Sequence, residues 1–130
     1  MYRILVADDE GIMLEAFKNV ISSTFGDSCI VETAKTGRAV TEIAEPFHPD
    51  IVFMDIHMPV MNGYEATRQI RALTDPALSG ITILAMTANA FDEDRKKVLE
   101  CGMDGFLSKP IIIEELIDTL QKLSLIHISE

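Results

Sequence analysis

Short apolar runs alternate with longer amphipathic segments along the chain. The runs have the pattern of strands buried in a sheet, and they predict strands at residues 2–7, 29–34, 51–55, 81–87 and 105–108. Between and after them, apolar residues recur at helical spacing, which predicts helices at residues 12–24, 36–45, 63–73, 91–100 and 112–123. Strands that alternate with helices in this way indicate an α/β fold, a doubly wound parallel sheet with right-handed crossovers.

The ends and faces of the helices follow from particular residues. The residues of the first helix that we expect to face the core are Ile12, Phe17, Val20 and Ile21. Thr36 is a suitable N-cap for the second helix, and we expect Pro46 to stop that helix near Glu45. After the third helix, Asp75 and Pro76 indicate a loop.

Length and composition narrow the class of protein. A chain of 130 residues is the size of one globular domain and buries enough surface to fold without a disulfide or a metal. Cys29 and Cys101 match no zinc-ligand spacing, which favours buried free thiols in a reducing compartment. Neither a membrane span nor a signal peptide is indicated, so we expect a cytoplasmic protein. The net charge of −10 argues against contact with nucleic acid but suits a cation.

Polar residues stand at the ends of four predicted strands. Asp8 and Asp9 follow the first strand, Asp55 ends the third, Thr87 ends the fourth and Lys109 follows the fifth. Each has an ordinary explanation alone, as a turn residue, a strand former or a surface lysine. In an open parallel sheet, however, the carboxyl ends of the strands form one ligand-binding edge. Three carboxylates crowded there would repel one another, and a divalent cation would neutralise them.

The motifs around these strand ends resemble those of one family. They read "VADDE", "FMDIHMPVMNGYEA", "AMTANA" and "FLSKP". With them, the chain resembles the receiver domain of two-component response regulators from about Tyr2 to Leu123. The resemblance implies a flavodoxin-like sheet of strand order 2-1-3-4-5, and we assign residues 1–122 to one receiver domain.

The resemblance also implies roles for the residues at the strand ends. Asp55 resembles the phosphoacceptor, which takes a phosphoryl group from the phosphohistidine of a histidine kinase. Asp9 and Asp55 resemble direct ligands of Mg²⁺, Asp8 a ligand through water, and the backbone carbonyl of His57 a further ligand. Lys109 is expected to contact the phosphoryl group. Such a domain is a signalling phosphoacceptor that catalyses only its own phosphorylation and dephosphorylation.

A switch is implied as well. Thr87 would donate its hydroxyl to the new phosphoryl oxygen, and Phe106 would fill the space that Thr87 leaves. The surface of helix 91–100, strand 105–108 and helix 112–123 would then change shape, and a homodimer through this surface is one use of it. Phe106 stands where the family often has tyrosine, and a simple core position is an equally good interpretation of it.

Three further expectations rest on the same resemblance. A cis peptide is implied between Lys109 and Pro110. The side chains of His57 and Asn89 are expected to affect the lifetime of the phosphoryl group. His57, beside methionines, also suggests a soft-metal site, but a lone loop histidine is more often a surface residue.

Other functions agree less well with the motifs. A haloacid-dehalogenase-type phosphatase would have a second aspartate at the position of His57, and a flavodoxin would have a phosphate loop where this chain has "ADDEGIM". A non-phosphorylated scaffold receiver would lack residues that are present. Two partner classes stay open, because the chain resembles both the N-terminal module of a response regulator and the receiver of a hybrid sensor kinase, which passes phosphate to a histidine phosphotransfer domain.

The last eight residues form a separate segment. "LSLIHISE", residues 123–130, breaks the helical spacing and has no counterpart in the family. It resembles the translation of a sequencing-library adapter. We therefore expect a non-native C-terminal tail, with a native tail as the alternative.

Overall fold

Five parallel strands form a single sheet in the computed structural model, which describes residues 2–58, 61–87, 92–109 and 112–122. The strands are β1 (Tyr2–Ala7), β2 (Cys29–Ala34), β3 (Ile51–Asp55), β4 (Thr82–Thr87) and β5 (Gly105–Ser108). Their order is β2-β1-β3-β4-β5, and every neighbouring pair is parallel. The flavodoxin-like fold class is therefore confirmed, and the strand bounds agree with the predicted ones apart from a later start of β4.

Helices connect the strands. They are α1 (Gly11–Phe25), α2 (Gly37–Phe47), α3 (Gly63–Arg71), α4 (Pro76–Ser79), α5 (Asp92–Glu100) and α6 (Ile113–Lys122), with a 3₁₀ turn at Gly26–Ser28. The short helix α4 was not predicted, so the expected number of five α-helices is too low by one for the described part of the chain. Asp75 caps α4 by accepting a hydrogen bond from the Ala77 N–H at 3.0 Å, and Pro76 occupies the first helical position. An Asp-Pro pair is a signal for such a helix start.

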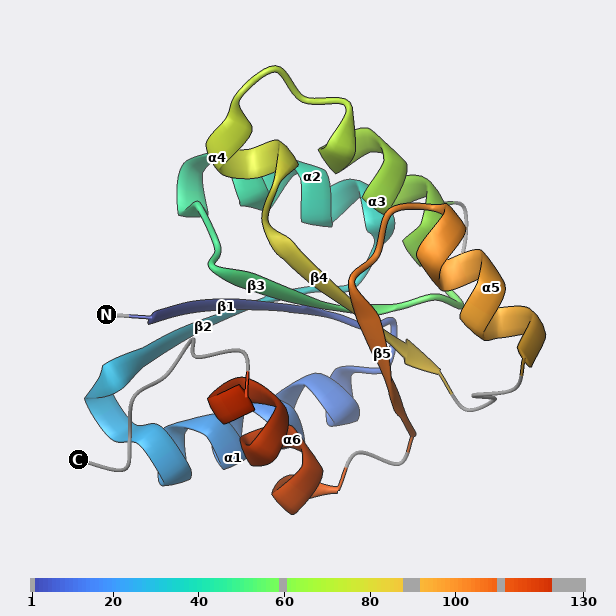
Figure 1. Cartoon of the computed structure of the whole chain (residues 1–130). Helices are drawn as coiled ribbons and strands as arrows, with labels where there is room; N and C mark the ends of the chain where they lie inside the picture. Colours follow the sequence, from blue (N-terminus) through green and yellow to red (C-terminus); the bar gives the residue numbers. More distant parts are fainter. Residues whose placement is uncertain (1, 59–60, 88–91, 110–111, 123–130) are drawn as a thin grey trace.

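The helices cover both faces of the sheet (Figure 1). Helices α2, α3, α4 and α5 lie on one face, and α1 and α6 lie on the other. Each face has its own apolar core, which includes Ala66 and Ile70 of α3 on the first side and Leu116 and Leu120 of α6 on the second. All five residues of β3 are buried. The central strand therefore ends in Asp55 with helices packed above and below it.

The core face of α1 differs from the predicted one. Ile12 is 87% exposed, whereas the buried residues of the helix are Leu14, Phe17, Ile21 and Phe25. These four follow one another at spacings of three and four residues, which places them on one side of the helix. Ile12 precedes Leu14 by two residues and so points to the opposite side. The prediction that Ile12 faces the core was wrong.

Helix α2 passes the proline that was expected to stop it. The helix starts after Thr36, whose side chain accepts a hydrogen bond from the Ala39 N–H, as predicted. It continues through Pro46 to Phe47. Because Pro46 is the penultimate residue, its missing N–H affects only the last turn. His48, with a φ of 51° in the left-handed region, then ends the helix.

The expectations about the two cysteines and about membrane spans can be compared with the structure. Both cysteines are free, but only Cys101 is buried, while Cys29 is half-buried. No helix in the described ranges has the length and apolar character needed to cross a membrane.

Candidate functional site

The chain leaves β1 through two aspartates with different surroundings. The Asp8 N–H donates to the Ala34 carbonyl at 3.0 Å, so the pairing with β2 continues past the end of β1. The Asp8 side chain is fully buried, and its Oδ1 accepts a hydrogen bond from the Glu10 N–H at 2.9 Å. Asp9 is exposed. The turn therefore directs one carboxylate inward and leaves its neighbour accessible to a ligand.

Asp55 lies at the centre of the same edge. It is the last residue of β3 and is 4% exposed, although its side chain is ionisable. Its Oδ1 accepts a hydrogen bond from the His57 N–H at 3.0 Å. The next residue, Ile56, donates its N–H to the Met86 carbonyl of β4 at 3.3 Å. The backbone on both sides of the turn thus holds the Asp55 carboxylate in place.

Lys109 reaches the two buried carboxylates from the far strand. Its N–H donates to the Thr87 carbonyl at 2.7 Å, which extends the β4–β5 pairing by one residue. Its Nζ donates to Asp8 Oδ2 at 2.7 Å and lies 3.4 Å from Asp55 Oδ2. Residues from three strand ends therefore form one charged cluster.

The cluster is dense in negative charge. One carboxylate oxygen from each of Asp8, Asp9 and Asp55 lies within 4.8 Å of the others. Burial raises the pKa of the Asp55 carboxyl, an effect that the His57 N–H and the Lys109 ammonium oppose and the Asp8 carboxylate increases. Burial alone would lower the pKa of Lys109, but the hydrogen bond to Asp8 and the charge of Asp55 outweigh it and hold that pKa above its usual value.

The oxygen atoms of this cluster fit a hard divalent cation. Carboxylate oxygens are the ligands that Mg²⁺ prefers. Both oxygens of Asp8 already accept hydrogen bonds, from Glu10 and Lys109. Asp9 is exposed, so its oxygens can approach an ion at the mouth of the site. The contrast between a direct Asp9 ligand and a water-mediated Asp8 ligand stays a prediction.

The two residues expected to form a switch lie on adjacent strands. Thr87 is buried at the end of β4, one residue beyond Met86, which pairs with Asp55. Phe106 lies on β5 and is half-buried, and its ring centroid is 5.0 Å from the Arg95 Cζ atom of α5. A simple core position for Phe106 is thus only partly right, because a surface cation covers the ring.

Some expected residues lie outside the described ones. Asn89, Pro110 and residues 123–130 are among them. The cis peptide between Lys109 and Pro110, the effect of Asn89 and the non-native tail therefore stay predictions. The same holds for the backbone carbonyl of His57 as a metal ligand, since only its N–H is seen in a contact with Asp55.

Two glycines support the site and were not predicted from the sequence. A Cβ atom on Gly63 would lie 2.6 Å from the Asp55 carbonyl oxygen and 2.9 Å from the Ile56 Cα. A Cβ atom on Gly37 would clash with the Met61 backbone. The first residues of α2 and α3 can therefore pack directly on the loop after Asp55. Only the glycine at the start of "GYEA" could have suggested this close approach.

Known proteins are similar to this chain over nearly its whole length. The family model described as "Response regulator receiver domain" matches residues 4–121. The sensor histidine kinase RcsC of Escherichia coli (strain K12) is 37% identical over 90% of this chain, which spans 12% of that protein. This chain spans only 7–13% of the length of five histidine kinases that it resembles.

Solved structures show the same architecture. Chemotaxis protein CheY4 of Vibrio cholerae superposes with a TM-score of 0.84 at 28% identity, over 94% of this chain and 98% of that one. The receiver domain of sensor histidine kinase PA1611 from Pseudomonas aeruginosa PAO1 has a TM-score of 0.80 at 32% identity, over 93% and 95%. That structure has a magnesium ion coordinated in its active-site cleft.

Proposed function

This chain belongs to the response regulator receiver domain family, and we propose that Asp55 is the residue that receives the phosphoryl group in two-component signalling. The convergence of Asp8, Asp9 and Asp55 within 4.8 Å, with the Lys109 ammonium between two of them, carries this assignment. Asp55 has the central position in this cluster, at the end of the middle strand. An oxygen of its carboxylate is the nucleophile.

Mg²⁺ is the cofactor that we propose. Asp9 and Asp55 would hold it directly and Asp8 through water, with the His57 carbonyl as a further ligand. When bound, the ion neutralises carboxylate and phosphoryl charge as the phosphoryl group is transferred. The oxygen-only side chains of the cluster and the magnesium ion in the PA1611 receiver domain support this choice.

The chemical step is an in-line displacement at phosphorus. A bond forms between Asp55 and phosphorus while the bond from phosphorus to a histidine nitrogen of the partner breaks, and the released imidazole takes a proton from solvent. Lys109, already 3.4 Å from Asp55 Oδ2, is close enough to contact the incoming phosphoryl oxygens. Attack by water on the acyl phosphate later restores Asp55. The chain is thus a phosphoacceptor, and hydrolysis of its own acyl phosphate limits the signal.

Phosphorylation would then change a distant surface. The added charge and acceptor oxygens attract the Thr87 hydroxyl, and the Phe106 ring follows into the space beside it. That movement would take Phe106 away from Arg95, which now lies over its ring. The face made by α5, β5 and α6 would therefore change shape, either for an output partner or for a second copy of the chain.

Exposed apolar residues around the site indicate where the phosphodonor docks. Ile12 follows Asp9 by three residues, and Ile112 and Ile113 follow Lys109 by three and four. They are 87%, 53% and 49% exposed. A histidine kinase is the donor that we propose, because sensor histidine kinases are among the relatives. Those relatives also support the alternative, a hybrid-kinase receiver that passes phosphate to a histidine phosphotransfer domain.

Acetyl phosphate tests the assignment of Asp55. Intact-mass spectrometry should detect one added phosphoryl group with Mg²⁺ and none without it, because the carboxylates then repel the donor. Asp55→Asn should remove the product. Asp50→Asn is the matched control, since Asp50 precedes the same strand but bonds to the Arg3 N–H at the opposite edge. Equal labelling of the Asp55→Asn variant and the wild-type protein would disprove the assignment.

The docking residues can be tested separately from the chemistry. Ile12→Ser should leave labelling by acetyl phosphate unchanged, since the Ile12 side chain is exposed and lies outside the acidic cluster. Transfer from phosphorylated histidine kinases or phosphotransfer domains should become slower. Unchanged transfer from every protein donor that phosphorylates the wild type would exclude this surface. If the phosphorylated chain passes its phosphoryl group to a phosphotransfer domain but exchanges none with a histidine kinase, the relay alternative is favoured.

A further inference from the structure

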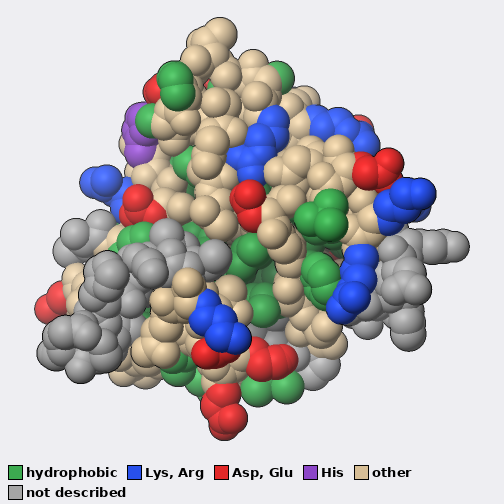
Figure 2. Space-filling model, in the orientation of Figure 1, with side chains coloured by type: hydrophobic (Ala, Val, Ile, Leu, Met, Phe, Trp, Pro, Cys, Tyr) green, Lys and Arg blue, Asp and Glu red, His purple; other side chains and the backbone are tan. Residues whose placement is uncertain are grey.

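Positive charge is gathered on two helices of an acidic protein. Although the net charge is −10, helices α3 and α5 carry five of the 11 Lys and Arg residues, namely Arg68, Arg71, Arg95, Lys96 and Lys97. Figure 2 shows Lys and Arg side chains over the part of the surface where these helices lie in Figure 1. The same helices also carry five acids, Glu65, Asp92, Glu93, Asp94 and Glu100. A preference for anions therefore depends on which of the cations face one pocket.

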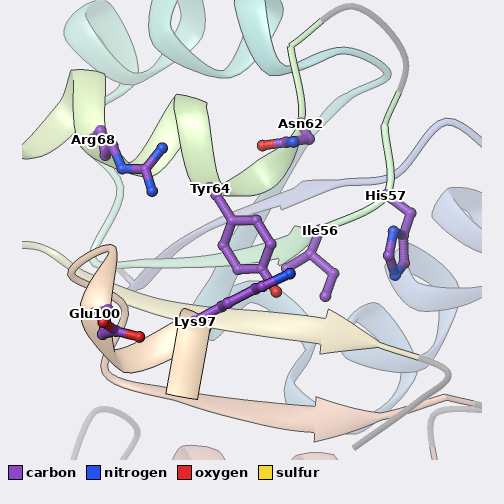
Figure 3. A pocket seen from close by; sticks show the side chains of 7 residues that line it. All are labelled: Ile56, His57, Asn62, Tyr64, Arg68, Lys97 and Glu100. Atoms are coloured by element: carbon purple, nitrogen blue, oxygen red, sulfur yellow. The ribbon is translucent and has the colours of Figure 1, made fainter. Parts of the chain in front are cut away.

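A pocket of about 450 Å³ opens beside these helices. Ile56 and His57 line it from the loop after β3, Tyr64 and Arg68 from α3, and Lys97 from α5 (Figure 3). Small-molecule sites commonly measure about 300–1,000 Å³. The pocket is therefore large enough for a compact organic ligand, and it is distinct from the acidic cluster around Asp55.

The two cations of the pocket have no ion-pair partner among the side chains that the structure describes. Arg68 and Lys97 come from different helices, and neither pairs with a described carboxylate, including the nearby Glu100. Asn62 adds a third donor, because its Oδ1 caps α3 through the Glu65 N–H while its amide NH₂ is left for another acceptor. Three donor groups thus border one hollow.

The rest of the lining comprises Ile56, His57, Tyr64 and one carboxylate, Glu100. Ile56 is buried, and the half-buried Tyr64 presents its ring at the centre of the pocket (Figure 3). A planar ring packs well against such a surface. An oxyanion attached to the ring of the ligand would lie near Arg68 and Lys97. A planar guanidinium group such as that of Arg68 binds phosphate or carboxylate with two hydrogen bonds.

We propose that this pocket binds a small organic oxyanion, a ring that carries a phosphate ester or carboxylate group. The ring packs on Tyr64 and Ile56, and the oxyanion lies between Arg68 and Lys97. Ile56 and His57 directly follow Asp55, so the ligand also contacts the loop after β3. In that loop the His57 N–H donates a hydrogen bond to the Asp55 carboxylate. An effect of this ligand on the lifetime of the phosphoryl group rests on the proposed function. Binding of the ligand to the pocket does not.

A titration followed by nuclear magnetic resonance tests the binding. The unphosphorylated, ¹⁵N-labelled chain without Mg²⁺ is titrated with adenosine 5′-monophosphate, isophthalate, adenosine and inorganic phosphate. At least one of the first two should shift the amide signals of His57, Tyr64 and Lys97 in a saturable way. Adenosine lacks the charge and inorganic phosphate lacks the ring, so both should bind more weakly. The better of the first two probes identifies the phosphate or the carboxylate as the favoured group.

Variants then locate the site. Arg68→Ala and Lys97→Ala should each weaken binding roughly tenfold, the effect of losing one charge-assisted hydrogen bond. Lys96→Ala is the matched control, because it removes the same charge from the same helix outside the pocket, and it should bind as the wild type does. Equal losses in all three variants, or adenosine binding as tightly as its monophosphate, would overturn the proposal. Asp55→Asn should retain binding, which separates this site from the phosphorylation site.

Discussion

Asp8 and Asp9 are neighbours in the chain, yet their carboxylates differ in what they can bind. Asp8 is buried and holds both the Glu10 N–H and the Lys109 ammonium, whereas Asp9 is exposed. Asp9→Ala should therefore weaken Mg²⁺ binding more than Asp8→Ala does, because it removes a direct ligand. Isothermal titration calorimetry with Mg²⁺ measures both affinities. A larger loss for Asp8→Ala would exchange the two roles.

Arg71 is a residue whose structural importance was not predicted. Its guanidinium donates to the carbonyls of Gly102, Ser79 and Ile81 and to the Asp104 carboxylate at 2.6–3.0 Å. Asp104 in turn accepts from the Ile83 N–H. One half-buried side chain thus joins the end of α3 to the segments that lead into β4 and β5.

Replacing Arg71 should destabilise the fold. Arg71→Ala leaves three carbonyls and a carboxylate without their donor, so we expect a loss of about 2–4 kcal/mol in the free energy of unfolding. Urea denaturation measures it. Arg68→Ala, on the exposed side of the same helix, is the control and should change stability by less than about 0.5 kcal/mol. Similar losses in both variants would show that the hydrogen bonds of Arg71 do not account for its effect.

The approach of α3 to β3 depends on Gly63. Because a Cβ atom there would lie 2.6 Å from the Asp55 carbonyl oxygen, Gly63→Ala must push the helix away from the strand end. We expect slower labelling by acetyl phosphate and a loss of stability of about 1–3 kcal/mol, typical of overpacking. Gly11→Ala is matched, since Gly11 also begins a helix but its Cβ would meet nothing closer than 3.6 Å. Labelling at the wild-type rate in Gly63→Ala would contradict this view.

Sequence patterns predicted elements better than they predicted contacts between elements. Buried strands are continuous apolar runs, so their bounds could be identified almost to the residue. The short helix α4 was missed because one turn has no periodicity to detect, and only the Asp75-Pro76 pair marked it. Ile12 was misplaced because hydrophobicity does not reveal which side of a helix faces the core when an apolar residue lies off the main stripe.

In the candidate site, too, the positions of residues could be predicted better than their contacts. Asp8, Asp55 and Lys109 could be brought together from the sequence because the carboxyl ends of parallel strands share an edge. The hydrogen bond between Lys109 and Asp8 joins residues 101 positions apart. It depends on side-chain conformation, which no local pattern contains. The pocket between α3 and α5 could not be predicted from the sequence for a related reason, because its cations, Arg68 and Lys97, belong to separate helices.

Across the whole molecule, charge and chemistry divide into two regions. The edge at the strand ends gathers three carboxylates, while the described surface of α3 and α5 includes Lys and Arg side chains (Figure 2). Both regions meet at His57, whose backbone contacts Asp55 and whose side chain lines the pocket. The loop after β3 is thus the physical link between an occupied pocket and Asp55, the proposed phosphoacceptor.

The extent of the folded unit can be tested at its C-terminal end. The buried residues of α6 are Leu116 and Leu120, and the family match ends at residue 121. We therefore propose that residues 125–130 are dispensable, as part of a non-native tail would be. Truncation after Ser124 should change the free energy of unfolding by well under about 1 kcal/mol and leave labelling by acetyl phosphate unchanged.

A substitution inside α6 provides the comparison for this truncation. Leu120→Ala should cost about 2–4 kcal/mol, because it removes a fully buried side chain from the core between α6 and the sheet. Urea denaturation of the full chain, the truncated chain and the Leu120→Ala variant gives all three stabilities under one set of conditions. If the truncation cost as much as Leu120→Ala, the last residues would contribute to the folded domain, and the boundary at residue 122 would be wrong.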